Sequence, residues 1–260
     1  MSRQAPAREV APAVQRLRLR YAKRGRLRFS SHRDFQRAFE RALRRAQIPI
    51  AFSAGFSPHP KVSYANAAPT GAASEAEYLE IAVTAACDPE RVRLALDAAL
   101  PPGLDIVEVV QARTPDFAAR LQASCWRIEL PGVGPQQAHQ AVAALLEVPE
   151  VIVERLTKNG RRSFDARGAI DRLELTPGEG QATSEGDQLA SPTTRPGECA
   201  ILTAVVRHGM PTVRPDDVLA ALRRVADLVP PAPPRVTRLA QGPLVPGERT
   251  IGDPFAEDRS

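Results

Sequence analysis

The chain has few residues of the kinds that build disulfide frameworks, zinc sites and membrane spans. It contains three cysteines, Cys87, Cys125 and Cys199, and because they are widely spaced and odd in number, neither a disulfide framework nor a zinc site is expected. A run of about 18 apolar residues, which a membrane-spanning helix needs, does not occur, and the N-terminal stretch has no apolar segment like that of a secretion signal. We therefore expect a cytoplasmic protein with no membrane partner, no metal and no other cofactor.

Aromatic residues and phosphate-binding loops are scarce as well. Aromatic residues make up 5% of the chain, while hydrophobic residues reach 43%, mainly through Ala, Val and Leu. This composition predicts aliphatic cores and disfavours a binding mode in which several bases stack on aromatic rings. The sequence has neither a P-loop nor a GxGxxG motif, so nucleotide hydrolysis and dinucleotide chemistry are not expected.

Positive charge, by contrast, is concentrated in one segment. Residues 16–47 contain twelve basic residues and only two acids, Asp34 and Glu40, whereas the whole chain has a net charge of +5. The basic residues are Arg16, Arg18, Arg20, Lys23, Arg24, Arg26, Arg28, Arg33, Arg37, Arg41, Arg44 and Arg45. Since the rest of the chain is net acidic, the basicity is a local patch of the kind that steers polyanions.

The first half of the chain predicts the element order βαββαβ. Residues 15–23 alternate Leu or Tyr with Arg, the pattern of a half-buried strand with one arginine-lined face. From His32 the apolar residues recur at helical spacing, behind a capping box of Ser31 and Asp34. The later elements expected here are strands at 61–65, 77–83 and 104–110 and a helix at 89–100.

The second half predicts the same order again. Its expected strands are 125–130, 151–157 turning into 161–167, 200–206 and 235–239, and its expected helices are 135–147 and 215–229. The fold class is therefore α+β, with two tandem ferredoxin-like units with antiparallel sheets in residues 15–115 and 120–241. Composition further predicts a mobile tail at 1–14, a disordered insertion at 176–198 and a disordered tail at 242–260.

Several stretches resemble a known family. The strongest are SHRDFQRAFERALRRA (31–46), FSAGFSPHPK (52–61) and GAASEAEYLEI (71–81), within a match from about Arg16 to Ile81. Weaker similarity is present in the second half, at GRRSFDAR and VTRLAQG. On these residues the chain resembles the radical SAM-linked family, a domain of unknown function (DUF2344), in its stand-alone form.

The resemblance implies a partner rather than a reaction. It implies association with a radical SAM enzyme and a place in RNA metabolism, of tRNA or rRNA. The chain lacks the CxxxCxxC spacing that holds the catalytic cluster of radical SAM enzymes. It is therefore similar to the associated domain without the enzyme.

Two groups of residues are candidates for binding RNA phosphates. The first is an arginine face, formed by Arg16, Arg18 and Arg20 of the strand and by Arg33, Arg37, Arg41, Arg44 and Arg45 of the helix. Arginine favours bidentate phosphate contacts, although a solvated basic face would use the same residues. The second is the loop GFSPHPK, where Pro58 and Pro60 hold Ser57, His59 and Lys61 in preset directions. A purely structural loop is the alternative.

Two histidines could supply catalysis. His32 opens the basic helix, where the helix dipole favours its neutral form, and either His32 or His59 could act as a general acid or base on a 2′-hydroxyl. For His32 the alternative is a role in packing the strand-to-helix turn. Phe164, Asp165 and Arg167 belong to the weaker similarity, and the sequence assigns them no chemistry.

The leading expectation is a non-enzymatic accessory protein that binds RNA through the arginine face. Two alternatives stay open: a metal-independent endoribonuclease with a histidine acid or base, and a protein–protein adaptor.

Overall fold

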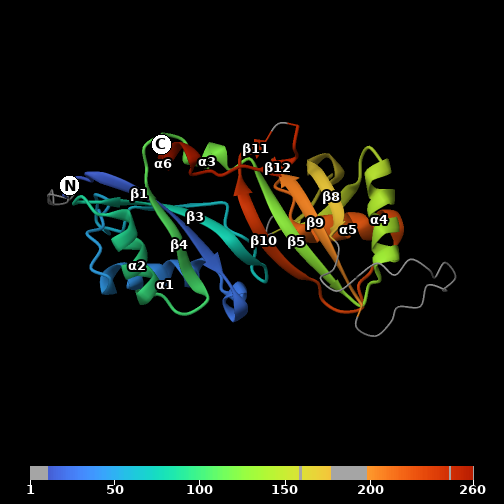
Figure 1. The fold of residues 1–260 in the computed structure, drawn as a ribbon, viewed down its shortest axis with the longest axis horizontal. Coiled ribbons are helices and arrows are strands. Elements are labelled where there is room, and N and C mark those ends of the chain that lie inside the picture. The colour runs from blue at the N-terminus through green and yellow to red at the C-terminus, as the bar shows by residue number, and fades with distance from the viewer. Residues whose placement is uncertain (1–10, 158–159, 177–197, 246, 260) are drawn as a thin grey trace, which may run out of the picture. The chain divides into compact units, whose positions relative to one another are not determined.

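The structure is a computed structural model that describes residues 11–157, 160–176, 198–245 and 247–259. The fold is α+β, and the chain forms two compact units (Figure 1). The first unit is Met1–Arg120 together with Asp253–Ser260, and the second is Leu121–Gly252. Among the described residues, no helix is long and apolar enough to cross a bilayer.

The first unit has every element that the sequence predicts for it. Its strands are β1 (Gln15–Lys23), β2 (Val62–Ala65), β3 (Ala73–Val83) and β4 (Leu104–Gln111). Its helices are the 3-10 helix η1 (Gly25–Phe29), α1 (His32–Arg45), α2 (Pro89–Ala99), α3 (Phe117–Arg120) and α6 (Ala256–Arg259). In the sheet β1 lies between β4 and β3, β2 pairs with β3, and all of these pairs are antiparallel.

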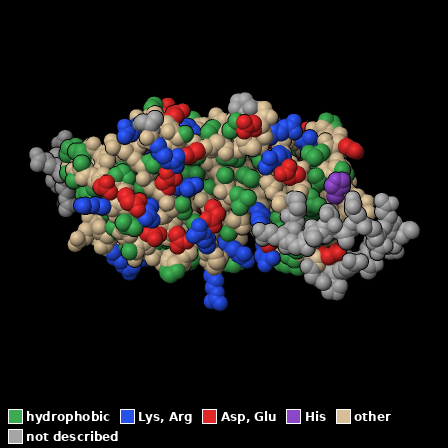
Figure 2. Space-filling view, viewed as in Figure 1, with side chains coloured by type: hydrophobic (Ala, Val, Ile, Leu, Met, Phe, Trp, Pro, Cys, Tyr) green, Lys and Arg blue, Asp and Glu red, His purple; other side chains and the backbone are tan. Residues whose placement is uncertain are grey.

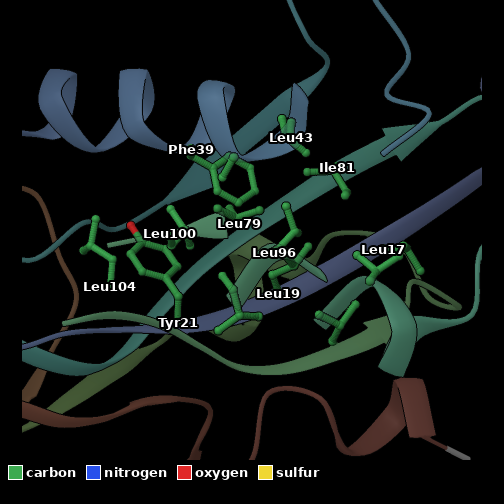
Figure 3. Close-up of a cluster of buried hydrophobic side chains, with 14 of the residues drawn as sticks. Leu17, Leu19, Tyr21, Phe39, Leu43, Leu79, Ile81, Leu96, Leu100 and Leu104 are labelled. Atoms are coloured by element: carbon green, nitrogen blue, oxygen red, sulfur yellow. The ribbon is translucent and has the colours of Figure 1, made fainter. Parts of the chain in front are cut away.

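The core of the first unit depends on the alternation in β1. Leu17, Leu19 and Tyr21 are buried and pack with Phe39 and Leu43 of α1 in one hydrophobic cluster (Figure 3). Because successive side chains of a strand point to opposite faces, the arginines between them lie on the face away from α1. We call this second side of the sheet the open face.

The beginning of α1 is fixed as the sequence predicts. The Ser31 hydroxyl accepts a hydrogen bond from the Asp34 backbone N–H at 3.2 Å, and the Asp34 carboxylate accepts from the Ser31 N–H at the same distance. This reciprocal capping box satisfies two backbone donors at the helix start. The helix therefore begins at a defined residue, and its arginines have a defined direction.

The prediction of a disordered tail at 242–260 is wrong for the described residues. Leu244–Val245 (β11) pairs with Thr250–Ile251 (β12), and the chain then returns to the first unit and ends in α6. Phe255 and Asp258 are buried there, and Figure 3 shows α6 on the open face, across the strands from α1. The composition of this tail is polar, but a few buried contacts are enough to order it.

The second unit contains four strands of one sheet and a separate hairpin, in addition to the paired strands β11 and β12. Its strands are β5 (Ala123–Pro131), β6 (Ile152–Thr157), β7 (Gly160–Asp165), β8 (Ile170–Thr176), β9 (Cys199–Arg207) and β10 (Arg235–Gly242). The sheet order is β10-β5-β9-β8, all antiparallel, and β6 pairs only with β7 among the described strands. Its helices are α4 (Pro135–Glu147), η2 (Arg167–Ala169) and α5 (Pro215–Ala226).

This arrangement corrects one part of the prediction for the second half. The hairpin at 151–167 exists, but it is not the second strand of the main sheet; that place is taken by β8. Strand β8 was not predicted, because it follows the hairpin after only a short 3-10 turn. The predicted insertion at 176–198 and mobile tail at 1–14 fall mostly outside the described residues.

We predict that the cluster between β1 and α1 carries much of the stability of the first unit. Leu43→Ala, at a side chain 1% exposed, should lower the free energy of unfolding by about 2–5 kcal/mol, because it leaves a cavity in the core. Leu94→Ala, at a side chain 54% exposed on α2, is the matched control and should change it by less than about 0.5 kcal/mol. Urea unfolding followed by circular dichroism measures both. Equal effects of the two substitutions would contradict this description of the core.

Candidate nucleic-acid interface

The arginines of α1 form one exposed stripe. Arg33, Arg37 and Arg41 are spaced by four residues, which places them on one side of a helix, and Arg44 and Arg45 continue that side; all five are exposed. Within the part of the chain that the structure describes, none of the five takes part in an ion pair. We call these residues the helix stripe. Figure 2 shows several Lys and Arg side chains along the lower border of the first unit, where Figure 1 places η1 and α1.

An aromatic ring lies just before the helix stripe in sequence. Phe29 is 60% exposed, and the guanidinium of Arg28 lies 4.7 Å from the centre of its ring. An exposed ring beside a cation is suited to stacking with a base. Sequence reasoning missed Phe29, because the alternation of residues 26–29 gives no sign of which side chains are left in water.

The strand arginines are not part of the same surface. Arg16, Arg18 and Arg20 lie on the open face, opposite α1, so the predicted arginine face is two separate groups. Arg18 is only 2% exposed, and its guanidinium binds the Asp258 carboxylate at 2.6 Å and Glu80 at 3.1 Å. It also lies 4.9 Å from the centre of the Phe117 ring. Arg18 is thus a buried structural residue, and its predicted exposure to a phosphate was wrong.

The other two strand arginines also have acidic partners. Arg16 lies 3.1 Å from Glu80, and Arg20 lies 3.5 Å from Glu108. Arg20 is half-exposed, whereas the Arg16 side chain is 68% exposed. Of the three, Arg16 has the most exposed side chain.

Asp258 of α6 sits in a ring of donors on the open face. Besides Arg18, its carboxylate accepts hydrogen bonds from the Arg113 N–H at 3.0 Å, the Thr114 hydroxyl at 3.0 Å and Arg120 at 3.2 Å. Burial alone would raise the pKa of Asp258, but the Arg113 N–H and the Arg18 guanidinium lower it below its ordinary value. The ionised carboxylate therefore neutralises the buried Arg18.

The loop residues His59 and Lys61 are grouped with Arg16. Together with Ser63 and Glu80 they line a hollow of about 220 Å³ on the open face. His59 is fixed by the Ser53 hydroxyl, which lies 3.0 Å from Nδ1 and accepts the His59 backbone N–H at 3.1 Å. Ser57 contributes its carbonyl, 3.3 Å from Nδ1, so its hydroxyl is not what holds the ring.

The structure separates the two candidate catalytic histidines. His32 lies edge-on to Tyr64, with ring centres 4.9 Å apart, and Tyr64 in turn packs against Phe35 in the α1 layer. The Gln36 amide nitrogen lies 3.1 Å from His32 Nε2. Since His59 lines a hollow on the open face, the sheet lies between the two imidazoles. They are not placed to act as an acid–base pair.

The residues of the weaker family similarity, Phe164, Asp165 and Arg167, have structural partners. Asp165 accepts backbone hydrogen bonds from Val151 at 3.0 Å and from Gly168 at 2.8 Å, and thereby ties the end of the hairpin to η2. Phe164 is buried beneath the guanidinium of Arg155, which lies 4.8 Å from its ring centre. Arg167 donates to the Ile170 carbonyl at 3.2 Å. Through these contacts the three residues have a structural role, at the corner where the β6–β7 hairpin is followed by η2 and β8.

Comparison with known families identifies a family model that covers most of the chain. The model of a family described as "Uncharacterized protein conserved in bacteria (DUF2344)" matches residues 16–215, which include the helix stripe, the loop of His59 and the corner at Asp165. No curated protein matches the chain.

We predict that Asp258 is required for the stability of the first unit. Asp258→Asn keeps the shape but leaves the buried Arg18 short of one countercharge, so the free energy of unfolding should fall by about 3–5 kcal/mol. The control is Glu257→Gln, at a neighbouring side chain that is 68% exposed, which should change it by less than about 0.5 kcal/mol. Chemical unfolding of the two variants tests this, and an Asp258 variant as stable as the control would refute the assignment.

The same carboxylate predicts a pH dependence. Because its pKa is lower in the folded than in the unfolded chain, its stabilisation is complete well above the ordinary value of about 3.9 and is lost as the pH falls through the lowered pKa. The stability difference between wild type and Asp258→Asn should therefore shrink as the pH is taken from about 6 toward 3. A difference that is constant over this range would show that the charge of Asp258 is not what stabilises the fold.

Proposed function

The chain belongs to the DUF2344 family, and we propose that it is a non-enzymatic accessory protein that binds RNA through the helix stripe. The observation that carries this proposal is the exposure of five arginines on one side of α1, without an ion pair among the described residues. Exposed guanidinium groups that form no ion pair with the described residues are available for bidentate contacts with phosphates. Neutralising phosphates also releases counterions, which favours binding at low salt.

The geometry of the stripe suits a nucleic-acid strand. At 1.5 Å per residue, the distance from Arg33 to Arg45 along α1 is about 18 Å, which spans several consecutive phosphates. The exposed ring of Phe29 lies just before the start of the same helix and could stack with a base. A stripe of this length with few acids supports a polymer rather than a small anion as the partner.

The fold supports the same proposal by analogy. In each unit the strand order and the antiparallel pairing fit a ferredoxin-like βαββαβ arrangement, β4-β1-β3-β2 in the first and β10-β5-β9-β8 in the second. We propose that the chain is a tandem of two such units, the second of them carrying the β6–β7 hairpin as an addition. Because one fold serves many functions, this argument is weaker than the one from the stripe.

The proposed partner enzyme would carry the chemistry. The resemblance of residues 16–81 to radical SAM-linked proteins suggests a radical SAM enzyme that acts on RNA in the cytoplasm. The chain has no CxxxCxxC motif of its own. In this proposal it holds the RNA while the enzyme reacts with it.

The endoribonuclease alternative keeps both candidates, His32 and His59, and because the sheet lies between them either one would act without the other. His59 has Arg16 and Lys61 beside it, groups that could stabilise a charged phosphorane. Cleavage of RNA in EDTA that is lost in His59→Ala would favour this alternative.

We predict that RNA affinity depends on the helix stripe. Arg37→Ala combined with Arg41→Ala should weaken binding about tenfold and reduce the slope of log K against log salt by about 2, because two phosphate contacts are lost. The matched control is Arg223→Ala with Arg224→Ala, two exposed arginines on α5 of the second unit, which should leave the slope unchanged. Fluorescence anisotropy with a labelled RNA over a range of salt measures both.

Two outcomes would overturn this proposal. One is the absence of RNA binding by the wild type at low salt, and the other is an equal loss of affinity in the two double variants. If RNA binding is absent but a partner protein is still retained after RNase treatment, and is released by the α1 variant, the stripe docks an acidic protein and the chain is an adaptor.

A further inference from the structure

The open face of the first unit places a small residue between two cationic ones. Arg16 of β1 lies opposite Ala82 of β3, and on the other side the Ala82 N–H donates to the Lys61 carbonyl at 3.1 Å. Val62 packs toward the core, so Lys61 before it points to the open face. Strands lie about 4.8 Å apart, and the two cationic residues are therefore about 10 Å apart, with only a methyl group between them. The hollow of about 220 Å³ lies at this place.

His59 completes the border of this hollow. Its Nδ1 is held by Ser53 and by the Ser57 carbonyl. Because a carbonyl only accepts, Nδ1 is the protonated nitrogen in that contact. In the parts of the chain that are described, no hydrogen bond involves Nε2. One ring nitrogen thus fixes the imidazole, and the other is available to a ligand.

The charges around the hollow leave room for an anion. Glu80 is the acid in its wall, and it is already bound by both Arg16 and Arg18 at 3.1 Å. Lys61 is exposed and forms no ion pair with the described residues. Arg16 has most of its side chain in water. A phosphate in the hollow would therefore lie beside the Arg16 guanidinium, the Lys61 amine and the His59 imidazole. The carboxylate in the wall, that of Glu80, is already paired with arginines.

A larger hollow adjoins the first and shares Arg16, Ser63 and Glu80 with it. Its volume is about 520 Å³, within the range of about 300–1,000 Å³ that is typical of small-molecule sites. Its walls are partly apolar, from residues such as Pro115 and Ala118. They also include the exposed carboxylate of Asp116, an acceptor suited to a ribose hydroxyl.

We propose that these two hollows form a site for a nucleoside monophosphate group. The phosphate binds among Arg16, His59 and Lys61, and the nucleoside occupies the larger hollow. The ligand is either a free nucleotide or the phosphorylated end of an RNA strand, which share this chemistry. The site goes beyond the helix stripe and does not depend on it, because the two lie on opposite sides of the sheet.

Isothermal titration calorimetry with adenosine 5′-monophosphate tests the site. Lys61→Ala removes a charge-assisted contact and should weaken binding about tenfold. Ala82→Leu changes no charge but fills the space between the cations, and it should weaken binding at least about tenfold as well. Arg45→Ala, which removes one positive charge from the helix stripe, is the matched control and should leave the affinity within about twofold. Adenosine without the phosphate should not bind measurably.

Oligonucleotides of one sequence distinguish the two possible ligands, a free nucleotide and the phosphorylated end of an RNA strand. Those with a 5′-phosphate, a 3′-phosphate or no terminal phosphate are compared in the wild type and in Lys61→Ala. A phosphorylated end that binds about tenfold more tightly, with the advantage lost in Lys61→Ala, identifies an RNA end as the ligand. Binding of the mononucleotide with no advantage for either phosphorylated end identifies a free nucleotide.

Other results overturn the proposal. The site does not exist if neither the mononucleotide nor a terminal phosphate binds at about 1 mM, or if Arg45→Ala weakens mononucleotide binding as much as Lys61→Ala does. Circular dichroism is used to test whether the Ala82→Leu variant is folded. Lys61→Ala changes an exposed side chain, so its effect on binding does not depend on that check. The double variant of Arg37 and Arg41 should keep full nucleotide affinity, so a failure of the helix stripe is distinguishable from a failure of this site.

Discussion

The constraint on which the first unit depends is the alternation of side chains along β1. Leu17, Leu19 and Tyr21 point into the core beneath α1, and the arginines between them must therefore point to the open face. A charge that is buried on that face needs a countercharge. For Arg18 the countercharge is Asp258, which lies in α6, 240 residues later in the sequence. The position of α6 follows from this pairing.

The same constraint divides the basic segment into surfaces with different roles. On the open face most of the arginine charge is matched by Glu80, Glu108 and Asp258, so the density of arginine in the sequence overstates the charge available there. On α1 the arginines point to water and need no partner in the protein. Among the described residues of this segment, the exposed arginines without ion pairs on α1 form one basic surface, and the open face keeps a small cationic hollow at the loop of His59.

Sequence patterns predicted the elements of the first unit because each one is encoded locally, in the alternation of β1, the capping box of Ser31 and the proline at the start of α2. The partner of Arg18 could not be predicted, since it lies 240 residues away in a tail without periodicity. The helix arginines and the strand arginines are separated because α1 packs on the face of β1 that carries Leu17 and Leu19. A count of the charges in residues 16–47 does not reveal this separation. Strand β8 was missed because the hairpin before it is an equally good candidate for the same place.

The most direct test of the central claim maps where RNA touches the protein. RNA containing 4-thiouridine is crosslinked to the full chain, and the crosslinked peptides are identified by mass spectrometry. If RNA docks on the helix stripe, the crosslinks fall within residues 29–45, around Phe29 and α1. Crosslinks confined to the second unit, Leu121–Gly252, would contradict the account.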